Sequence, residues 1–169
     1  MLRIALDIDE VLADFMNSYL NRFGDPKTEY EITRNVQRKL SMDREFWLTL
    51  PVINTLNFEP ELYCTKRVNP KVWTKTWLKI NNFPKRPVYQ MFYQKGNKAD
   101  MIKGRCDVLI DDSYSNVIKA ISSGLPALLY TSPWNKDIDF RYRINSLDIK
   151  EIESMYELLV LDGITGNKT

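Results

Sequence analysis

The stretch that decides the fold is Leu2-Arg3-Ile4-Ala5-Leu6-Asp7-Ile8-Asp9, at the start of a chain of 169 residues. Residues 2–6 are mostly apolar and indicate a buried strand of a parallel sheet. Two carboxylates follow, with one residue between them. A second apolar run, residues 108–110, also ends in an acidic pair, Asp111-Asp112. Ligands of open parallel sheets bind beyond the carboxyl ends of the strands, so the sequence predicts that the four carboxylates meet there.

Four carboxylates at one edge of a sheet repel one another unless positive charge lies between them. A hard divalent cation with oxygen ligands, most simply Mg²⁺, would resolve this repulsion. The chain has no histidine, which excludes Ser-His-Asp and Cys-His catalysis and any His-ligated metal. Acid–base chemistry must therefore come from carboxylates, Lys or Tyr. The pattern favours metal-assisted phosphoryl chemistry.

Composition bounds the class of protein. Hydrophobic residues make up 44% and charged residues 27% of the chain, which is typical of a globular domain with a core. The net charge of +2 is too small to indicate nucleic-acid binding. We see no signal peptide, and no apolar stretch reaches the roughly 20 residues of a membrane span. Cys64 and Cys106 lie in or beside apolar runs, so we expect buried free thiols and a cytoplasmic protein, in the host cytoplasm if it is viral.

Strands and helices are expected to alternate along most of the chain. We expect an α/β core domain of residues 1–14 and 59–169, with a central parallel sheet flanked by helices. Residues 15–58 are expected to form a small helical insertion. The apolar spacing predicts strands at 2–6, 61–64, 88–93, 106–110, 126–130 and near 143–145, and helices at 11–23, 70–80, 98–103, 113–122 and 147–161.

Four short motifs now point to a family. Residues 7–15, Asp-Ile-Asp-Glu-Val-Leu-Ala-Asp-Phe, resemble the first motif of the haloacid dehalogenase (HAD) phosphatase superfamily. Within it they look most like the 5′(3′)-deoxyribonucleotidase branch and its phage and bacterial relatives. Thr65, Lys98 and Asp111-Asp112 resemble the second, third and fourth motifs, in order. The resemblance covers nearly the whole chain and implies the Rossmann-like HAD fold, with residues 15–58 as a small helical cap.

The resemblance also implies a mechanism, that of a Mg²⁺-dependent hydrolase of nucleoside monophosphates. Asp7 would attack phosphorus to form an aspartyl phosphate. Asp9 would protonate the leaving oxygen and then activate water. The implied ligands of Mg²⁺ are Asp7, the Asp9 backbone carbonyl, Asp111 and Asp112, and the implied phosphate-binding residues are Thr65, Lys66 and Lys98.

Each of these residues also has a simpler interpretation. Asp7 and Asp9 could belong to a solvated turn, and Asp111-Asp112 to a helix cap. Thr65 could be an ordinary residue at the end of a strand. Lys95 and Lys103 lie close to Lys98 in sequence, and either could take its role.

One residue departs from the family pattern. The superfamily usually has Gly directly after the second Asp, and this chain has Glu10. Gly often marks a backbone with positive φ or a close backbone approach. Glu10 therefore needs a tolerable backbone there, and its charge would either weaken phosphate binding or point away. We hypothesise that Glu10→Gly leaves the fold intact and preserves or raises turnover.

Aromatic residues in the cap suggest how a substrate would be selected. Phe15, Phe46 and Trp47 resemble the positions that line the base pocket in deoxyribonucleotidases, although core packing is an alternative for each. We expect Trp73 and Trp77 in the core or at a homodimer interface. The cap also contains the basic residues Arg34, Arg38 and Lys39. We expect them to face either an anionic substrate or solvent. The loop 132–136 is expected at the same end of the sheet, where it could help to close the site.

The leading hypothesis is therefore a phosphomonoesterase that acts on a small phosphate ester, most simply a deoxyribonucleoside monophosphate. One alternative is a 3′-phosphatase for nucleic-acid ends, which the small net charge disfavours. Another is a nucleotide-binding protein that has the fold but has lost turnover, with Glu10 as the feature in its favour. Neither a membrane nor nucleic acid is expected as a partner.

Overall fold

The centre of the molecule is a six-stranded sheet in which every pairing is parallel. The computed structural model describes residues 1–25, 32, 35–92 and 96–165. The strands lie in the order β3-β2-β1-β4-β5-β6. Their bounds are Ile4–Leu6 (β1), Leu62–Lys66 (β2), Val88–Met91 (β3), Val108–Asp111 (β4), Ala127–Tyr130 (β5) and Arg143–Ile144 (β6). The expected α/β class with a central parallel sheet is confirmed.

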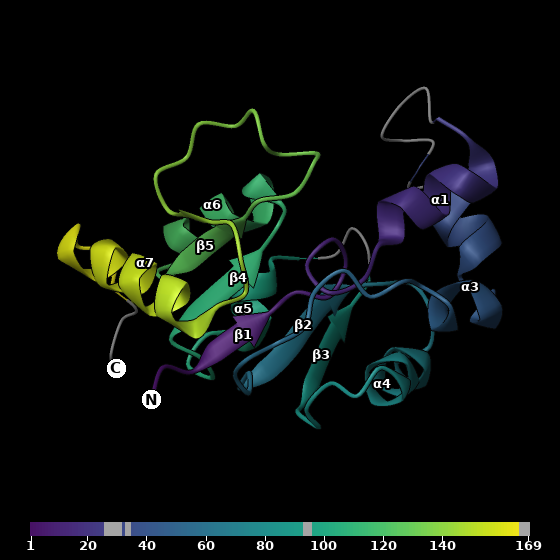
Figure 1. Cartoon of the computed structure of the whole chain (residues 1–169), viewed down its shortest axis with the longest axis horizontal. Helices are drawn as coiled ribbons and strands as arrows, with labels where there is room; N and C mark the ends of the chain where they lie inside the picture. Colours follow the sequence, from purple (N-terminus) through teal and green to yellow (C-terminus); the bar gives the residue numbers. More distant parts are fainter. Residues whose placement is uncertain (26–31, 33–34, 93–95, 166–169) are drawn as a thin grey trace.

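Helices cover both faces of this sheet, as Figure 1 shows. Alternate strand residues face opposite layers because the side-chain period of a strand is two. On one face, Ala5 and Leu109 pack with apolar residues of α5 (Lys98–Ile102) and α6 (Tyr114–Ser122). On the other face, Leu6 and Ile110 pack with residues of α4 (Lys71–Ile80) and α7 (Ile149–Leu161). None of the described helices is long and apolar enough to cross a membrane.

The direction in which successive strands are added to the sheet reverses at β1. From β1 the chain runs outward through β2 to β3, and it then returns to β4 on the other side of β1. In β1 and β4, Leu6 pairs with Ile110, so the residues that follow both strands lie side by side. Such a switch point is where open α/β sheets bind ligands. The fold therefore brings the two acidic pairs to a position suited to a binding site.

The described part of residues 15–58 is mostly helical. It contains α1 (Phe15–Phe23), the π-helical turn η1 (Val36–Leu40) and α3 (Arg44–Leu48). Figure 1 shows α1 and α3 beyond the β3 edge of the sheet, with α3 next to α4. Trp77 of α4 is fully buried, and its indole Nε1 donates to the carbonyl of Leu50 at 2.9 Å, which ties the segment to the core. Trp73 is only partly buried against the same core.

The start of the first helix differs from the expectation. The apolar spacing predicts a helix from Val11, but α1 begins at Phe15, with Asp14 as its N-cap. Residues 11–13 are buried in a tight loop instead, in which the N–H groups of Leu12 and Ala13 both donate to the Ile8 carbonyl. Periodic burial alone does not distinguish a buried loop from a helix.

Candidate phosphoryl-transfer site

The site begins where β1 and β4 end. Asp7 directly follows β1, and Asp111 is the last residue of β4. The backbone N–H of Asp7 donates to the carbonyl of Ile110 at 2.9 Å, so the ladder between the strands continues to the acidic residues. The carboxylates of Asp7, Asp111 and Asp112 each offer an oxygen within 4.8 Å of the others. Three of the four predicted metal ligands thus form one cluster through their side chains.

Lys98 lies between two of these carboxylates. It is the first residue of α5, and its side chain is 2% exposed. The ammonium Nζ is 2.7 Å from Asp7 Oδ1 and 2.7 Å from Asp111 Oδ2. Lys103, the alternative, instead donates to the carbonyl of Ser123 at 2.8 Å. Lys95 lies outside the described residues. Of the two lysines that can be compared, Lys98 is the one that meets the acidic cluster.

Burial and mutual repulsion dominate the electrostatics of the cluster. Burial raises the pKa of Asp7 to about 7, although Lys98 opposes this shift. Burial also raises the pKa of Asp112 well above its usual range, and the charges of Asp111 and Asp7 add to it. Burial alone would lower the pKa of Lys98, but the two neighbouring carboxylates raise it. The pKa shifts of Asp7 and Asp112 thus come first from burial, and the neighbouring charges modify them.

The donor set of this cluster fits a hard divalent cation. Three carboxylates and one ammonium leave a formal charge of −2. Carboxylate oxygens are the ligands that Mg²⁺ prefers, and a divalent cation would offset this remaining charge.

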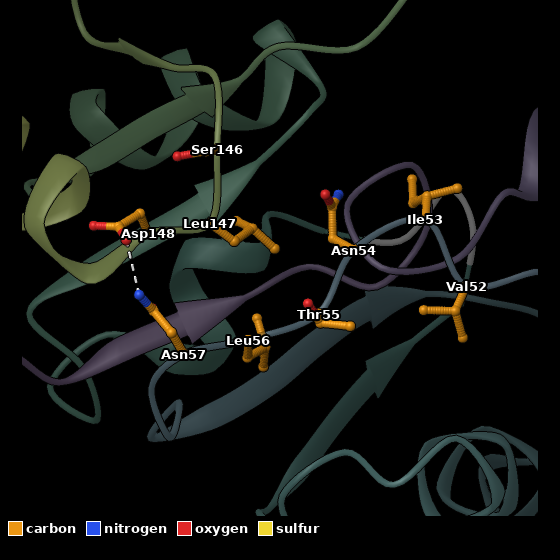
Figure 2. A pocket seen from close by; sticks show the side chains of 9 residues that line it. All are labelled: Val52, Ile53, Asn54, Thr55, Leu56, Asn57, Ser146, Leu147 and Asp148. Carbon is orange, nitrogen blue, oxygen red and sulfur yellow. Dashed lines mark hydrogen bonds between the residues drawn. The ribbon is translucent and has the colours of Figure 1, made fainter.

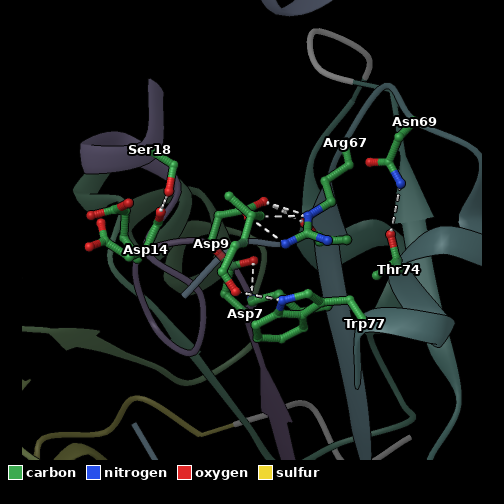
Figure 3. Close-up of polar contacts among 12 residues, drawn as sticks. Asp7, Asp9, Asp14, Ser18, Arg67, Asn69, Thr74 and Trp77 are labelled. Atoms are coloured by element: carbon green, nitrogen blue, oxygen red, sulfur yellow. Dashed lines mark hydrogen bonds and ion pairs between the residues drawn. The ribbon is translucent and has the colours of Figure 1, made fainter. Parts of the chain in front are cut away.

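Asp9 has different partners from the other three acids. Its carboxylate accepts hydrogen bonds from Arg67, at 3.0 and 3.1 Å from Nε and 2.6 Å from Nη2. The hydroxyl of Thr65, in β2, donates to Asp9 Oδ2 at 3.2 Å. Figure 3 shows the guanidinium of Arg67 facing Asp9, with Asp7 close by. The side chain of Asp9 is therefore held apart from the acidic cluster by Arg67 and Thr65.

Lys66 and Asn116 extend the site towards α6. Nζ of Lys66 donates to Oδ1 of Asn116 at 3.0 Å, and the amide of Asn116 donates to both oxygens of Asp111, at 3.1 and 3.2 Å. Burial lowers the pKa of Lys66, and the charge of Lys98 adds to this shift. Lys66 thus contributes positive charge at the edge of the acidic cluster.

Glu10 has the positive φ that Gly usually provides at this position of the motif. Its φ is +60°, in the left-handed region that favours Gly. Its carboxylate accepts from the backbone N–H of Met16 at 2.6 Å and from the indole Nε1 of Trp134 at 2.8 Å. Burial raises the pKa of Glu10. Both oxygens of Glu10 are therefore used in linking the first turn of α1 to the loop after β5.

The loop after β5 contacts the site, as its position in the sequence suggested. Asn135 is 4% exposed, and its amide donates to the carbonyl of Asp112 at 2.7 Å and to that of Tyr130 at 2.8 Å. Its Oδ1 accepts from Nη1 of Arg143 at 2.8 Å. Asn135 therefore fixes the backbone at one of the predicted metal ligands.

The three predicted base-binding aromatics form one cluster. The rings of Phe15 and Trp47 stack at a centroid distance of 5.7 Å, and Phe46 meets both edge-on. Phe46 and Trp47 are 5% and 1% exposed, whereas Phe15 is half-buried. Nε1 of Trp47 also donates to the carbonyl of Leu40 at 2.7 Å. Phe46 and Trp47 pack within the helical segment, so Phe15 has the most surface left for a ligand.

The basic residues of the helical segment face solvent where they are described. Arg38 and Lys39 are exposed, and Nζ of Lys39 lies 5.1 Å from the centre of the Phe23 ring. Arg34 lies outside the described residues. The exposure of Arg38 and Lys39 agrees with the interpretation that they face solvent.

Two surface hollows lie outside the acidic cluster. One, of about 470 Å³, is lined by residues 52–57 and 146–148 (Figure 2). Two of its polar side chains are already paired, because Asn57 donates to Asp148 and Asn54 donates to Val11 and Tyr130. The other, of about 420 Å³, lies between α1 and α3 and is lined in part by Phe46. We place the functional site at the carboxylates, where the charge is concentrated.

Sequence reasoning missed three residues of the site: Arg67, Asn116 and Asn135. Arg67 directly follows Thr65 and Lys66 in the sequence, but nothing in that run indicates which acid it meets. Asn116 lies in the first turn of α6, which begins three residues after Asp111. Asn135 had no signal beyond its place in a loop at the correct end of the sheet.

The arrangement can bind a cation, hold an anionic group near Thr65, Lys66 and Lys98, and present two separate carboxylates to it. No model of a known protein family matches the chain, and neither does any curated protein. The geometry of the site therefore carries the inference about function.

Proposed function

We propose that the chain is a Mg²⁺-dependent phosphomonoesterase of the HAD type that hydrolyses nucleoside monophosphates, with deoxyribonucleotides as the leading class. The observation that carries this proposal is the meeting of Asp7, Asp111, Asp112 and Lys98 where β1 and β4 end, with Asp9 held beside them. Residues 15–58 would act as the cap over this site.

Asp7 is the proposed nucleophile. Its carboxylate oxygen would form a bond to phosphorus while the bond from phosphorus to the leaving oxygen breaks. Lys98 lies 2.7 Å from Asp7 and would offset charge on the phosphoryl group. The hydroxyl of Thr65 and the ammonium of Lys66 would hold other phosphate oxygens.

Asp9 is the proposed general acid and base. It would give a proton to the leaving oxygen in the first step and take one from water in the second. The carboxylates of Asp7, Asp111 and Asp112 and the carbonyl of Asp9 would hold Mg²⁺. When bound, Mg²⁺ supplies positive charge that lets an anionic nucleophile approach an anionic phosphate.

Substrate selection would fall to the cap. The half-buried ring of Phe15 is backed by Trp47 at 5.7 Å, a geometry that supports stacking of a base on its exposed side. The carboxylate of Glu10 is engaged by Met16 and Trp134, which supports an active enzyme over one disabled by that residue.

The test is phosphate release from a panel of 5′- and 3′-mononucleotides with Mg²⁺. We expect selective release that chelation abolishes and that Asp7→Asn lowers at least a thousandfold. The exposed Asp137 provides a matched control, because Asp137→Asn removes the same charge outside the acidic cluster. Binding of a nucleotide without release by the wild type would contradict the proposal and favour a binding protein. Faster release from 3′-phosphorylated oligonucleotides than from mononucleotides would favour the nucleic-acid alternative.

A further inference from the structure

Arg67 is a buried cation that the four motifs do not include. It directly follows β2, and its side chain is fully buried, with 0% exposure. Its Nε and Nη2 donate to both oxygens of Asp9, at distances of 2.6 to 3.1 Å (Figure 3). Asp9 itself is 21% exposed. Arg67 therefore fixes the position of the Asp9 carboxylate, and the side chain of Asp9 remains partly exposed.

Two aromatic rings and the sheet hold the guanidinium of Arg67 in place. Its central carbon lies 5.1 Å from the ring centre of Trp47, in the helical segment, and 5.9 Å from that of Trp77, in α4. The backbone N–H of Arg67 donates to the carbonyl of Met91 at 3.1 Å. Nη1 has no hydrogen-bond partner among the described residues. Arg67 therefore connects Asp9 rigidly to both the core and the helical segment.

Packing alone gives no reason for a charge at this position. Desolvation of a buried ion pair often outweighs the attraction between its members, and apolar replacements of similar volume are often neutral or stabilising. An arginine fork does, however, fix the plane of a carboxylate, because two parallel donors meet its two oxygens. The geometry thus indicates a role that depends on the orientation of Asp9.

We propose that Arg67 is a positioning residue that orients Asp9 for proton transfer to the leaving group. This inference rests on the proposed function. In the first half-reaction an oxygen of Asp7 bonds to phosphorus, the bond to the leaving oxygen breaks, and that oxygen takes the proton of the Asp9 carboxyl. The carboxylate that remains on Asp9 then faces Arg67. Arg67 would thus both aim the acid and stabilise the charge that the transfer creates.

The readout is the dependence of kcat/KM on the leaving group, measured with a series of substituted phenyl phosphates. These differ in the basicity of the leaving oxygen and little in size. In a two-step reaction, kcat/KM reports only the steps up to and including formation of the aspartyl phosphate, which is when the leaving group departs. A basic leaving oxygen needs the proton from Asp9, whereas nitrophenolate leaves without it. Proton transfer by a positioned side chain contributes about 10²–10⁴-fold.

We expect Arg67→Gln to lower kcat/KM at least tenfold more for phenyl phosphate than for 4-nitrophenyl phosphate. Arg67→Lys keeps the charge but not the fork, so its loss of kcat/KM for phenyl phosphate should be intermediate. If the Gln variant does not fold, the Lys variant is measured in its place. Combining Arg67→Gln with Asp9→Asn should add little to the loss from Asp9→Asn alone, because both act on one proton transfer.

Arg105 is the matched control. It is an exposed arginine whose guanidinium lies 5.2 Å from the Tyr89 ring, before β4 and thus away from the strand ends that carry the site. Arg105→Gln should leave the leaving-group dependence unchanged. An equal loss across the whole series in a folded Arg67→Gln variant would overturn the inference while leaving the proposed function intact. No phosphate release by the wild type from any phenyl phosphate or nucleotide would overturn both.

Discussion

At the scale of single residues, Glu10 balances a strained backbone against two hydrogen bonds. A non-Gly residue in the left-handed region costs about 1–2 kcal/mol, and Glu10 has a φ of +60°. Its carboxylate accepts from Met16 and from Trp134, and each such bond contributes about 1 kcal/mol net. The two effects are of similar size, so neither the backbone nor the side chain decides the stability alone.

This balance gives a prediction for Glu10→Gly. The variant relieves the backbone but releases Met16 and Trp134, so we expect its free energy of unfolding to change by less than about 1 kcal/mol. Turnover should stay within tenfold of the wild type, because both oxygens of Glu10 are bound to groups outside the acidic cluster. Urea unfolding and phosphate release measure the two effects.

The control for this prediction is Glu10→Gln, which keeps both the backbone strain and the length of the side chain. It should be less stable than Glu10→Gly, because the strain remains and the amide NH2 of Gln, which cannot accept, would face one of the two donors. A drop in turnover above tenfold in Glu10→Gly would show that Glu10 itself serves the reaction.

At the scale of elements, the loop between β5 and β6 depends on one side chain. Asn135 joins this loop to the backbone of Asp112 and Tyr130 and accepts from Arg143. The carbonyl of Asp112 would lose this donor if Asn135 were shortened. The loop therefore sets the position of a proposed metal ligand even though none of its own residues is expected to bind the ion.

We expect Asn135→Ala to lower the free energy of unfolding by about 3 kcal/mol, since several buried polar groups lose their partner. Residues that orient metal ligands typically affect affinity by 10–100-fold, so Mg²⁺ should bind about tenfold more weakly. Thermal unfolding and Mg²⁺ titration measure the two effects.

Asn145 is a suitable control for Asn135. It is exposed and accepts one hydrogen bond, from Thr131 at 2.8 Å. Asn145→Ala should change the free energy of unfolding by no more than about 0.5 kcal/mol and leave Mg²⁺ affinity unaltered. Equal effects of the two substitutions would argue against a specific role for Asn135.

The helices and strands also show which sequence patterns predicted the structure correctly. The strands and the helices after residue 60 were predicted with bounds within a few residues, because their apolar periods and caps are local. The start of α1 was predicted wrongly. Residues 11–13 are as buried as a helix face would be, yet their backbone closes a loop on Ile8. Burial was therefore predictable there, and conformation was not.

At the scale of the whole molecule, a bound cation should stabilise the fold. The carboxylates of Asp7 and Asp111 come from two strands that are far apart in sequence, so the site forms only in the folded chain. At a hundredfold excess over its Kd, a ligand stabilises the folded state by about 2.7 kcal/mol. For a chain of this size we expect Mg²⁺ to raise Tm by about 5–10 °C.

Asp111→Asn tests whether this stabilisation comes from the acidic cluster. The substitution keeps the shape of the side chain and removes one charge, so most of the increase in Tm should disappear. Na⁺ at matched ionic strength separates cation binding from salt screening. An equal increase in Tm in the wild type and in Asp111→Asn would place the cation elsewhere.

The two free thiols report on the integrity of one apolar layer, the one that contains Ala5 and Leu109. Cys64 and Cys106 are 0% and 5% exposed. Burial raises the pKa of Cys106 to about 12, and it also raises that of Cys64. Because the thiolate is the reactive form, neither thiol should react with a disulfide reagent at pH 8 until the chain unfolds. Reaction at rates typical of exposed thiols in native buffer would contradict the packing described.

The sequence by itself determined the strands, their parallel arrangement and the place of the acidic pairs at the strand ends. These features depend on local apolar patterns and on the rule that binding residues follow parallel strands. The tertiary structure decided which partners the acids meet. Arg67 lies 58 residues from Asp9, Trp134 lies 124 from Glu10, and Asn135 lies 23 from Asp112. No local period encodes such pairings, because they depend on where the folded backbone brings side chains within hydrogen-bonding distance.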